Sequence, residues 1–174
     1  MSTIAALLQE LEQEAQTTRR VLERVPNDRL QWKPHDKSMS LGQLALHVAT
    51  VPGAIAEMAG RSPFQLPEFV QESATDVSQL IPALERSIAT ARSALRSMDD
   101  SALTKTWRVV DGEREVMAMP VGGLLRSVML NHWYHHRGQL SVYLRQVGAL
   151  VPSIYGPSAD ENPFAKPFQA AMFI

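Results

Sequence analysis

Apolar residues recur at helical spacing in four long stretches of the chain, and this pattern constrains the fold more than any other feature of the sequence. The stretches cover residues 3–24, 40–60, 76–98 and 121–147. In each of them apolar side chains follow one another at intervals of three or four positions, so they share one face of a helix. Helices of this kind bury their apolar faces against each other. The sequence therefore predicts an all-α protein built as a four-helix bundle.

Residues with strong capping preferences mark the ends of these helices. Ser40 and Gln43 have the spacing of a capping box at the start of the second stretch, and Gly148 is suited to end the last one. Pro52 lies inside the second stretch, where a proline ring removes one backbone hydrogen bond. We therefore expect a kink or an earlier end of that helix near Pro52.

The segments between the helices differ in character. Residues 61–75 contain two prolines and no clear period, which is typical of an irregular connection that crosses the molecule. In residues 104–119 the apolar residues no longer follow the helical spacing. Asp111-Gly112 at the centre of this segment is typical of a hairpin turn. A small two-stranded β-hairpin is expected before the last long helix. The turn-rich residues 151–163 are expected to wrap the bundle as an ordered tail.

The length and composition exclude several classes of protein. A chain of 174 residues suits a single domain over residues 1–174. No apolar run approaches the length of a membrane span and the N-terminus lacks an export signal, so a soluble, cytoplasmic protein is expected. Seventeen Lys and Arg residues against eighteen Asp and Glu residues leave a net charge of -1. Without a basic cluster, nucleic acid is not an expected partner.

The chain has no cysteine, so any metal ion must be bound by nitrogen and oxygen ligands. Three of the five histidines stand within residues 131–140. His132 and His136 are four positions apart, which separates them by only about 40° around a helix. Both follow the apolar face of the last stretch and are expected to point into the bundle. His135 lies about 100° from His136 and is expected nearer the edge.

His47 occupies a similar position in the second stretch, between Leu44 and Val51 on the apolar face. Three imidazoles from two helices can therefore converge. Burying them without partners costs roughly 1–3 kcal/mol for each stranded nitrogen, and a shared divalent ion removes that cost. Three histidines also leave a coordination position open for water or substrate, as in catalytic zinc sites.

Other interpretations of these residues stay open on this reasoning. A lone inward histidine more often forms a hydrogen bond with a backbone carbonyl or a hydroxyl than it binds a metal ion. Trp133 stands where the metalloprotease motif has a Glu after its first histidine, which disfavours a protease. His35 lies in a polar loop and is most simply a solvated residue. The three tryptophans are expected to be packing residues: Trp32, Trp107 and Trp133.

Three segments together form a recognisable pattern. They are residues 32–47, which end in His47, residues 131–139, which read Asn-His-Trp-Tyr-His-His-Arg-Gly-Gln, and residues 148–161. They resemble the DinB/YfiT-like superfamily of metalloenzymes. The resemblance implies helices in up-down-down-up order, a homodimer, and a divalent ion bound by His47, His132 and His136. The long connection at residues 61–75 agrees with that order, because two neighbouring helices that run the same way need a crossover.

The resemblance also implies an activity on small molecules. Some members of the superfamily transfer a low-molecular-weight thiol onto electrophiles or isomerise maleylpyruvate with mycothiol, and others resemble hydrolases. Our leading hypothesis is a thiol-dependent S-transferase with zinc or nickel, because a metal-bound sulfur becomes a thiolate and this chain has no cysteine of its own. A metal-dependent hydrolase and a non-catalytic bundle that binds a metal or ligand are the alternatives.

Residues beside the histidine pair are candidates for supporting roles. Asn131 or Gln139 could bind the second nitrogen of a ligand imidazole or a substrate oxygen, and a place on the helix surface is an equal alternative. Arg137 could attract a substrate carboxylate. The favoured interpretation is a salt bridge from Arg137 to another helix or to the tail, where Asp160 and Glu161 are candidate partners.

Overall fold

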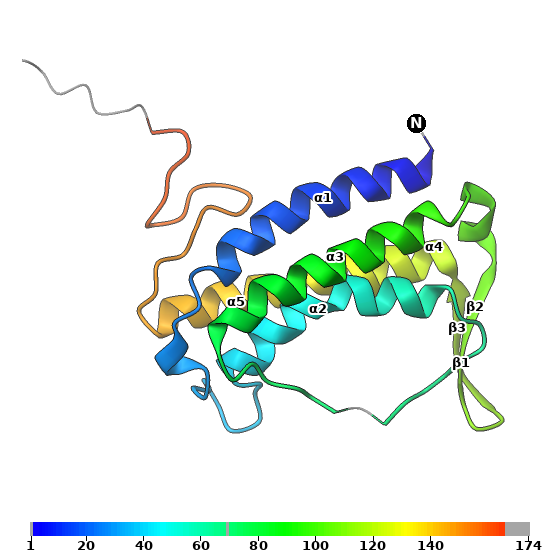
Figure 1. Cartoon of the computed structure of the whole chain (residues 1–174), viewed down its shortest axis with the longest axis horizontal. Helices are drawn as coiled ribbons and strands as arrows, with labels where there is room; N and C mark the ends of the chain where they lie inside the picture. Colours follow the sequence, from blue (N-terminus) through cyan, green and yellow to red (C-terminus); the bar gives the residue numbers. More distant parts are fainter. Residues whose placement is uncertain (1, 69, 166–174) are drawn as a thin grey trace, which may run out of the picture.

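The protein is mostly helical, with a small sheet at one end of its helices (Figure 1). The computed structural model describes residues 2–68 and 70–165. Four long helices make up the body of this part of the chain: α1 (Thr3–Leu22), α2 (Leu41–Ala59), α3 (Leu80–Arg96) and α5 (His132–Gln146). Short 3₁₀ turns lie between them at Asn27–Arg29, Val77–Gln79 and Asp100–Thr104. The four helical stretches expected from apolar spacing are therefore confirmed.

The expected capping residues act at the ends of the helices. The Ser40 hydroxyl accepts a hydrogen bond from the Gln43 N–H at 3.1 Å, and the Gln43 side chain accepts one from the Ser40 N–H at 2.8 Å. This capping box satisfies two groups that would otherwise lack a partner at the start of α2. Gly148 follows α5 with a φ of 79°, a backbone conformation that glycine adopts without steric cost.

Helix α2 continues through Pro52 to Ala59, so the expected earlier end does not occur. Because Pro52 has no N–H, the carbonyl of Val48, four residues earlier, loses its usual donor. The indole N–H of Trp133 donates to that carbonyl at 2.8 Å. A side chain from α5 thus satisfies the group that proline leaves free in α2.

The same part of α2 lies very close to α3. The Gly53 N–H donates to the Ser87 hydroxyl at 2.8 Å, and that hydroxyl donates to the Thr50 carbonyl at 3.1 Å. A Cβ atom at position 53 would lie 2.7 Å from the Ser87 carbonyl oxygen. Glycine is therefore required where the two helices approach so closely.

The sheet has three strands in the order β1-β2-β3: β1 (Phe64–Gln65), β2 (Thr106–Asp111) and β3 (Arg114–Pro120). The antiparallel β2–β3 hairpin confirms the expected ribbon. Its turn lies one residue later than expected, at residues 112–113, because Asp111 pairs with Arg114. Gly112 there has a φ of 61°. The sequence did not predict the third strand, β1, which pairs in parallel with β2 and is too short to show a period.

The last helical stretch is not a uniform α-helix. After α4 (Val121–Gly123), residues Leu124–Asn131 (η4) form a π-helix, and α geometry resumes at His132. The wider π turn shifts the buried face of the helix relative to the expected face. Beyond it the buried positions are Trp133, Arg137, Leu140 and Leu144.

This shift changes the position of the histidine pair. His132 and His136 each precede a buried residue by one position, and both are only partly buried. The expectation that they point into the bundle is confirmed in part, because they face His47 of α2 but lie beside the core. His135 is exposed, which agrees with its expected place nearer the edge.

The C-terminal tail contacts the helices as expected. Asp160 accepts hydrogen bonds from the Val151 N–H at 2.8 Å and from the Arg145 side chain of α5 at 2.6 Å. Glu161 pairs with Arg20 of α1 at 2.5 Å. These contacts attach the tail to two of the long helices.

The helices of the described residues differ from membrane spans. None of them combines the length and the apolar character that crossing a bilayer requires.

We predict that Trp133→Phe lowers the free energy of unfolding by about 1–3 kcal/mol, because the buried Val48 carbonyl loses its donor. Chemical denaturation measures the effect. The loss should shrink in a Pro52→Ala background, where position 52 regains a backbone N–H that can replace the indole. Trp32→Phe is the control, since Trp32 is only partly buried and packs edge-on against Tyr143. An equal cost of Trp133→Phe in both backgrounds would contradict the prediction.

Candidate metal centre

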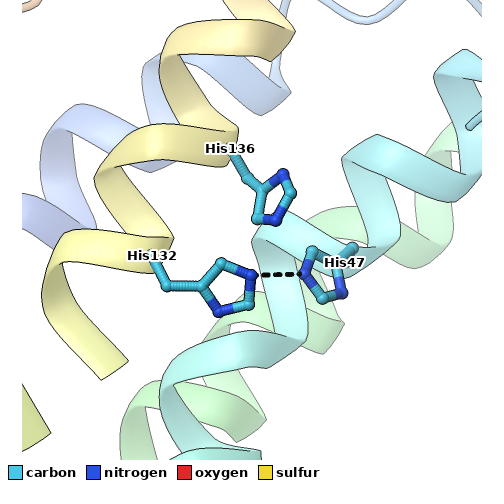
Figure 2. A group of neighbouring side chains, drawn as sticks. All are labelled: His47, His132 and His136. Carbon is cyan, nitrogen blue, oxygen red and sulfur yellow. Dashed lines mark hydrogen bonds between the residues drawn. The ribbon is translucent and has the colours of Figure 1, made fainter. Parts of the chain in front are cut away.

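Three imidazole rings from two helices point toward one another beside the core (Figure 2). His47 comes from α2, and His132 and His136 come from adjacent turns of α5. One nitrogen of each ring lies within 4.8 Å of the corresponding nitrogens of the other two. The structure therefore brings together the three residues that the sequence selected.

The spacing of these nitrogens fits a divalent ion. Tetrahedral ligands about 2.0–2.1 Å from a zinc ion lie roughly 3.4 Å from each other. The Nε2 atoms of His47 and His132 are 3.5 Å apart. This separation is long for a hydrogen bond between two rings and matches the edge of a coordination sphere. The group can hold a metal ion with three nitrogen ligands.

The second nitrogens of two rings are bound by groups that accept hydrogen bonds. Nδ1 of His136 donates to Oε1 of Gln139 at 2.7 Å, and Nδ1 of His132 donates to the Val128 carbonyl at 3.3 Å. With their protons on Nδ1, both rings present the lone pair of Nε2 to the centre of the group. Gln139 thus has the supporting geometry considered from the sequence. Asn131 is exposed, and its side chain forms no hydrogen bond with the described residues.

The surroundings of two of these histidines, His47 and His136, favour the uncharged imidazole. Burial, together with the neighbouring rings of His136 and His132, lowers the pKa of His47 from 6.5 to about 4. Burial also lowers the pKa of His136, against the opposing effect of Gln139. Since a metal ligand must be a neutral imidazole, both shifts favour metal binding.

The other histidines do not belong to the group. His135 is exposed, and its ring lies 5.0 Å from that of His136, centroid to centroid. His35 is also exposed, and its Nδ1 accepts a hydrogen bond from the Lys37 N–H at 3.1 Å. These positions agree with the bystander role expected for His135 and the solvated state expected for His35.

Arg137 is buried and faces away from the three-histidine group. Its side chain is 1% exposed and pairs with Glu14 of α1 at 2.5 Å. The same guanidinium donates to the hydroxyls of Thr18 and Tyr155. The expected interhelical salt bridge is therefore confirmed, with Glu14 as its partner, whereas Asp160 and Glu161 of the tail pair with Arg145 and Arg20. Its partners also leave no place for a substrate carboxylate.

The tryptophans are packing residues, as expected. Trp133 and Trp107 are 0% and 2% exposed. The indole N–H of Trp107 donates to the carbonyls of Met58 and Arg61, which attaches the sheet to the end of α2. Trp32 packs against Tyr143 with ring centroids 5.4 Å apart.

A cavity of about 320 Å³ lies directly beside the histidine group. His47 and His132 line it together with apolar side chains of α2, among them Val51, Ile55 and Met58. Its opposite wall comes from residues 70–72 of the connection between α2 and α3. A small molecule in this cavity would lie against His47 and His132, two of the three imidazoles.

Glu72 contributes a carboxylate to the lining of this cavity, and the sequence did not single it out. It stands in a segment without a period, where no pattern relates its position to that of the histidines. Only the path of the connection brings it near the site.

Comparison with known proteins supports a single family. The DinB family model matches residues 1–165. The uncharacterized protein YrdA of Bacillus subtilis is 29% identical over 163 residues, which cover 91% of this chain and 92% of YrdA.

Two solved structures resemble the fold. A DinB-like protein from Bacillus cereus superposes with a TM-score of 0.70 at 26% identity, over 88% of this chain and 99% of that one. A mycothiol-dependent maleylpyruvate isomerase superposes with a TM-score of 0.52 at 15% identity. That match covers 86% of this chain and 62% of the isomerase, and at this identity it shows a likeness of fold alone.

We predict that Arg137→Met lowers the free energy of unfolding by about 3–5 kcal/mol, because Glu14 is left largely buried without its partner. Arg145→Met, which removes the pair with Asp160 at the surface, should cost far less, because solvent screens exposed charges. Urea denaturation of both variants provides the comparison. Similar losses in the two variants would show that the buried pair stabilises the fold no more than the exposed pair does.

We also predict that the metal-free protein loses stability as the pH falls from 7 toward 5. The unfolded chain binds a proton at His47 near pH 6.5, whereas the folded chain binds it only near pH 4. The free energy of unfolding therefore decreases as the pH falls through this window. Denaturation in the presence of a chelator should show a shallower decrease for His47→Gln and an unchanged one for His35→Gln. If the free energy of unfolding depends on pH equally in wild type and His47→Gln, the prediction is wrong.

Proposed function

The chain belongs to the DinB family, and from that membership and its three-histidine group we propose that it is a metal-dependent enzyme that transfers a low-molecular-weight thiol onto a small electrophile. The observation that carries the proposal is the convergence of His47, His132 and His136 at ligand distance beside a cavity. Three protein ligands leave a position where a substrate atom can bind, which is typical of catalytic rather than structural metal sites.

Zinc or nickel is the proposed ion, because both accept three imidazole ligands. Bound there, such an ion would lower the pKa of a coordinated thiol and so supply a thiolate at neutral pH. The chain has no cysteine, so the reacting sulfur comes from the cosubstrate. The fold shared with a mycothiol-dependent isomerase supports a thiol in this role.

The chain's own residues orient the ligands and shape the space around them. Gln139 and the Val128 carbonyl hold two imidazoles with Nε2 toward the centre. The apolar side chains of α2 receive the apolar part of the electrophile and keep water from it. In the overall reaction the sulfur forms a bond to carbon, the leaving group departs with its electron pair, and the thiol proton passes to solvent.

A metal-dependent hydrolase is the second candidate, and Glu72 is the observation that favours it. Hydrolysis needs a base that accepts a proton from the attacking water. Glu72 supplies a carboxylate to the cavity that His47 and His132 line. In this alternative, Glu72→Gln lowers kcat. A non-catalytic bundle would bind the metal ion and turn over neither class of substrate.

Other expectations from the sequence join the proposal. We propose the up-down-down-up order of the four long helices, which the long connection between α2 and α3 supports (Figure 1). A single domain, a homodimer and a cytoplasmic location are proposed with it. Size-exclusion chromatography with light scattering tests the dimer, and a monomeric mass would exclude it.

We predict that the protein binds one equivalent of zinc or nickel and that His47→Ala, His132→Ala and His136→Ala each lose it. Each substitution removes one of three ligands, whereas His135→Ala removes an exposed imidazole outside the group. Elemental analysis of protein without a histidine tag gives the stoichiometry. If His135→Ala loses the metal as completely as the other variants, the assignment of ligands is wrong.

Activity assays on the metal-loaded protein separate the candidate functions. With a panel of small thiols and a chlorinated aromatic electrophile, the transferase should release chloride in a thiol-dependent reaction that stops in His132→Ala. Ester or amide hydrolysis without any thiol would favour the hydrolase instead. Thermal denaturation with and without chelator adds a control, because a large loss of stability without turnover indicates a structural ion.

A further inference from the structure

A second cavity adjoins the one beside the histidines. It has a volume of about 550 Å³ and lies between α3, the connection before it, and Leu46 of α2. Leu46 and Glu72 line both cavities, so the two adjoin at these residues. Arg86 of α3 lines the second cavity and not the first. Across the two adjoining cavities the order is therefore the histidines, then Glu72, then Arg86.

Hydrogen bonds attach the connection to the helix that carries His47. The Ala74 N–H donates to the Gly42 carbonyl at 3.3 Å, and the Gln43 side chain donates to the Gln71 carbonyl at 3.5 Å. These bonds lie on either side of Glu72. They hold the backbone around Glu72 against α2, so that Glu72 lies in the lining of both cavities.

Glu72 and Arg86 carry opposite charges in one cavity without pairing. Ten other arginines of the described residues form ion pairs with carboxylates. Within residues 2–68 and 70–165, neither the Glu72 carboxylate nor the Arg86 guanidinium forms an ion pair or hydrogen bond. Both groups are exposed to the cavity and available to a ligand.

We propose that this second cavity binds the zwitterionic part of the substrate, with an ammonium group at Glu72 and a carboxylate at Arg86. A guanidinium can donate two parallel hydrogen bonds to a carboxylate, and a carboxylate accepts those of an ammonium. The order of the groups places the ammonium nearer the reacting end of the molecule. The substrate class is therefore a small peptide-like molecule with a free amine and a distal acid. This inference rests on the proposed function, which puts the reacting end at the histidines.

Three related peptides test the proposal by calorimetry on zinc-loaded protein. Cysteinylglycine has both charges in the required order, N-acetylcysteinylglycine lacks the ammonium, and cysteinylglycinamide lacks the carboxylate. Arg86→Gln should weaken binding of the first two about tenfold and leave the amide unchanged. Glu72→Gln should weaken binding of cysteinylglycine and the amide and leave the N-acetyl peptide unchanged.

Arg96→Gln is the matched control. Arg96 is an exposed arginine of the same helix that lines neither cavity, so its substitution should change none of the affinities. Equal affinity of wild type, Glu72→Gln and Arg86→Gln for cysteinylglycine would overturn the proposal. Absence of binding of all three peptides at millimolar concentration would overturn it as well.

Serylglycine and metal-free protein separate this proposal from the proposed function. In one outcome cysteinylglycine binding depends on Glu72 and Arg86, serylglycine binds equally well, and removing the metal changes nothing. Zwitterion binding at Glu72 and Arg86 is then supported, and metal-dependent thiol transfer is refuted. In the other outcome binding requires the thiol and the metal but is unchanged in Glu72→Gln and Arg86→Gln. Metal-dependent thiol binding is then supported, and zwitterion binding at Glu72 and Arg86 is refuted.

Discussion

The hydrogen bond from the Trp133 indole to the Val48 carbonyl sets the register of the two helices that carry the histidines. Val48 follows His47 in α2, and Trp133 follows His132 in α5, so this bond acts one residue away from the three-histidine group on both sides. Pro52 makes the bond necessary, because without a proline N–H the buried carbonyl has no donor in its own helix. Proline disrupts helices in other contexts, but here it helps to set the relative position of two of the three histidines.

The site also depends on which face of α5 is buried. The π-helix at Leu124–Asn131 turns Trp133 and Arg137 into the core and leaves His132 and His136 at its edge. Burial at the edge still lowers the pKa of His47 and His136, so the rings stay neutral. At the same time the group opens onto a cavity. Histidines in the middle of the bundle would also have lowered pKa values, but they would not face a cavity.

Helical spacing alone identified much of this arrangement, and its failures have physical causes. Residues four apart on a helix share a side, so the pair His132 and His136 could be assigned from the chain alone. An interhelical salt bridge of Arg137 was expected, but its partner Glu14 was not named, because spacing within one helix does not report which residue of another helix lies opposite. The strand Phe64–Gln65 was missed because two residues carry no period. Glu72 and Arg86 were missed because contacts between distant segments place them together.

By itself the sequence determined the four helices, the hairpin, and the three histidines that can share an ion, because these follow from periodicity and short-range capping. Only the tertiary structure decided that the histidines lie beside a cavity, that Arg137 is a buried partner of Glu14, and that Glu72 and Arg86 face one space. These features depend on the packing of segments far apart in the chain. Packing depends on which face each helix buries against the others, whereas a sequence pattern shows only which face of one helix is apolar.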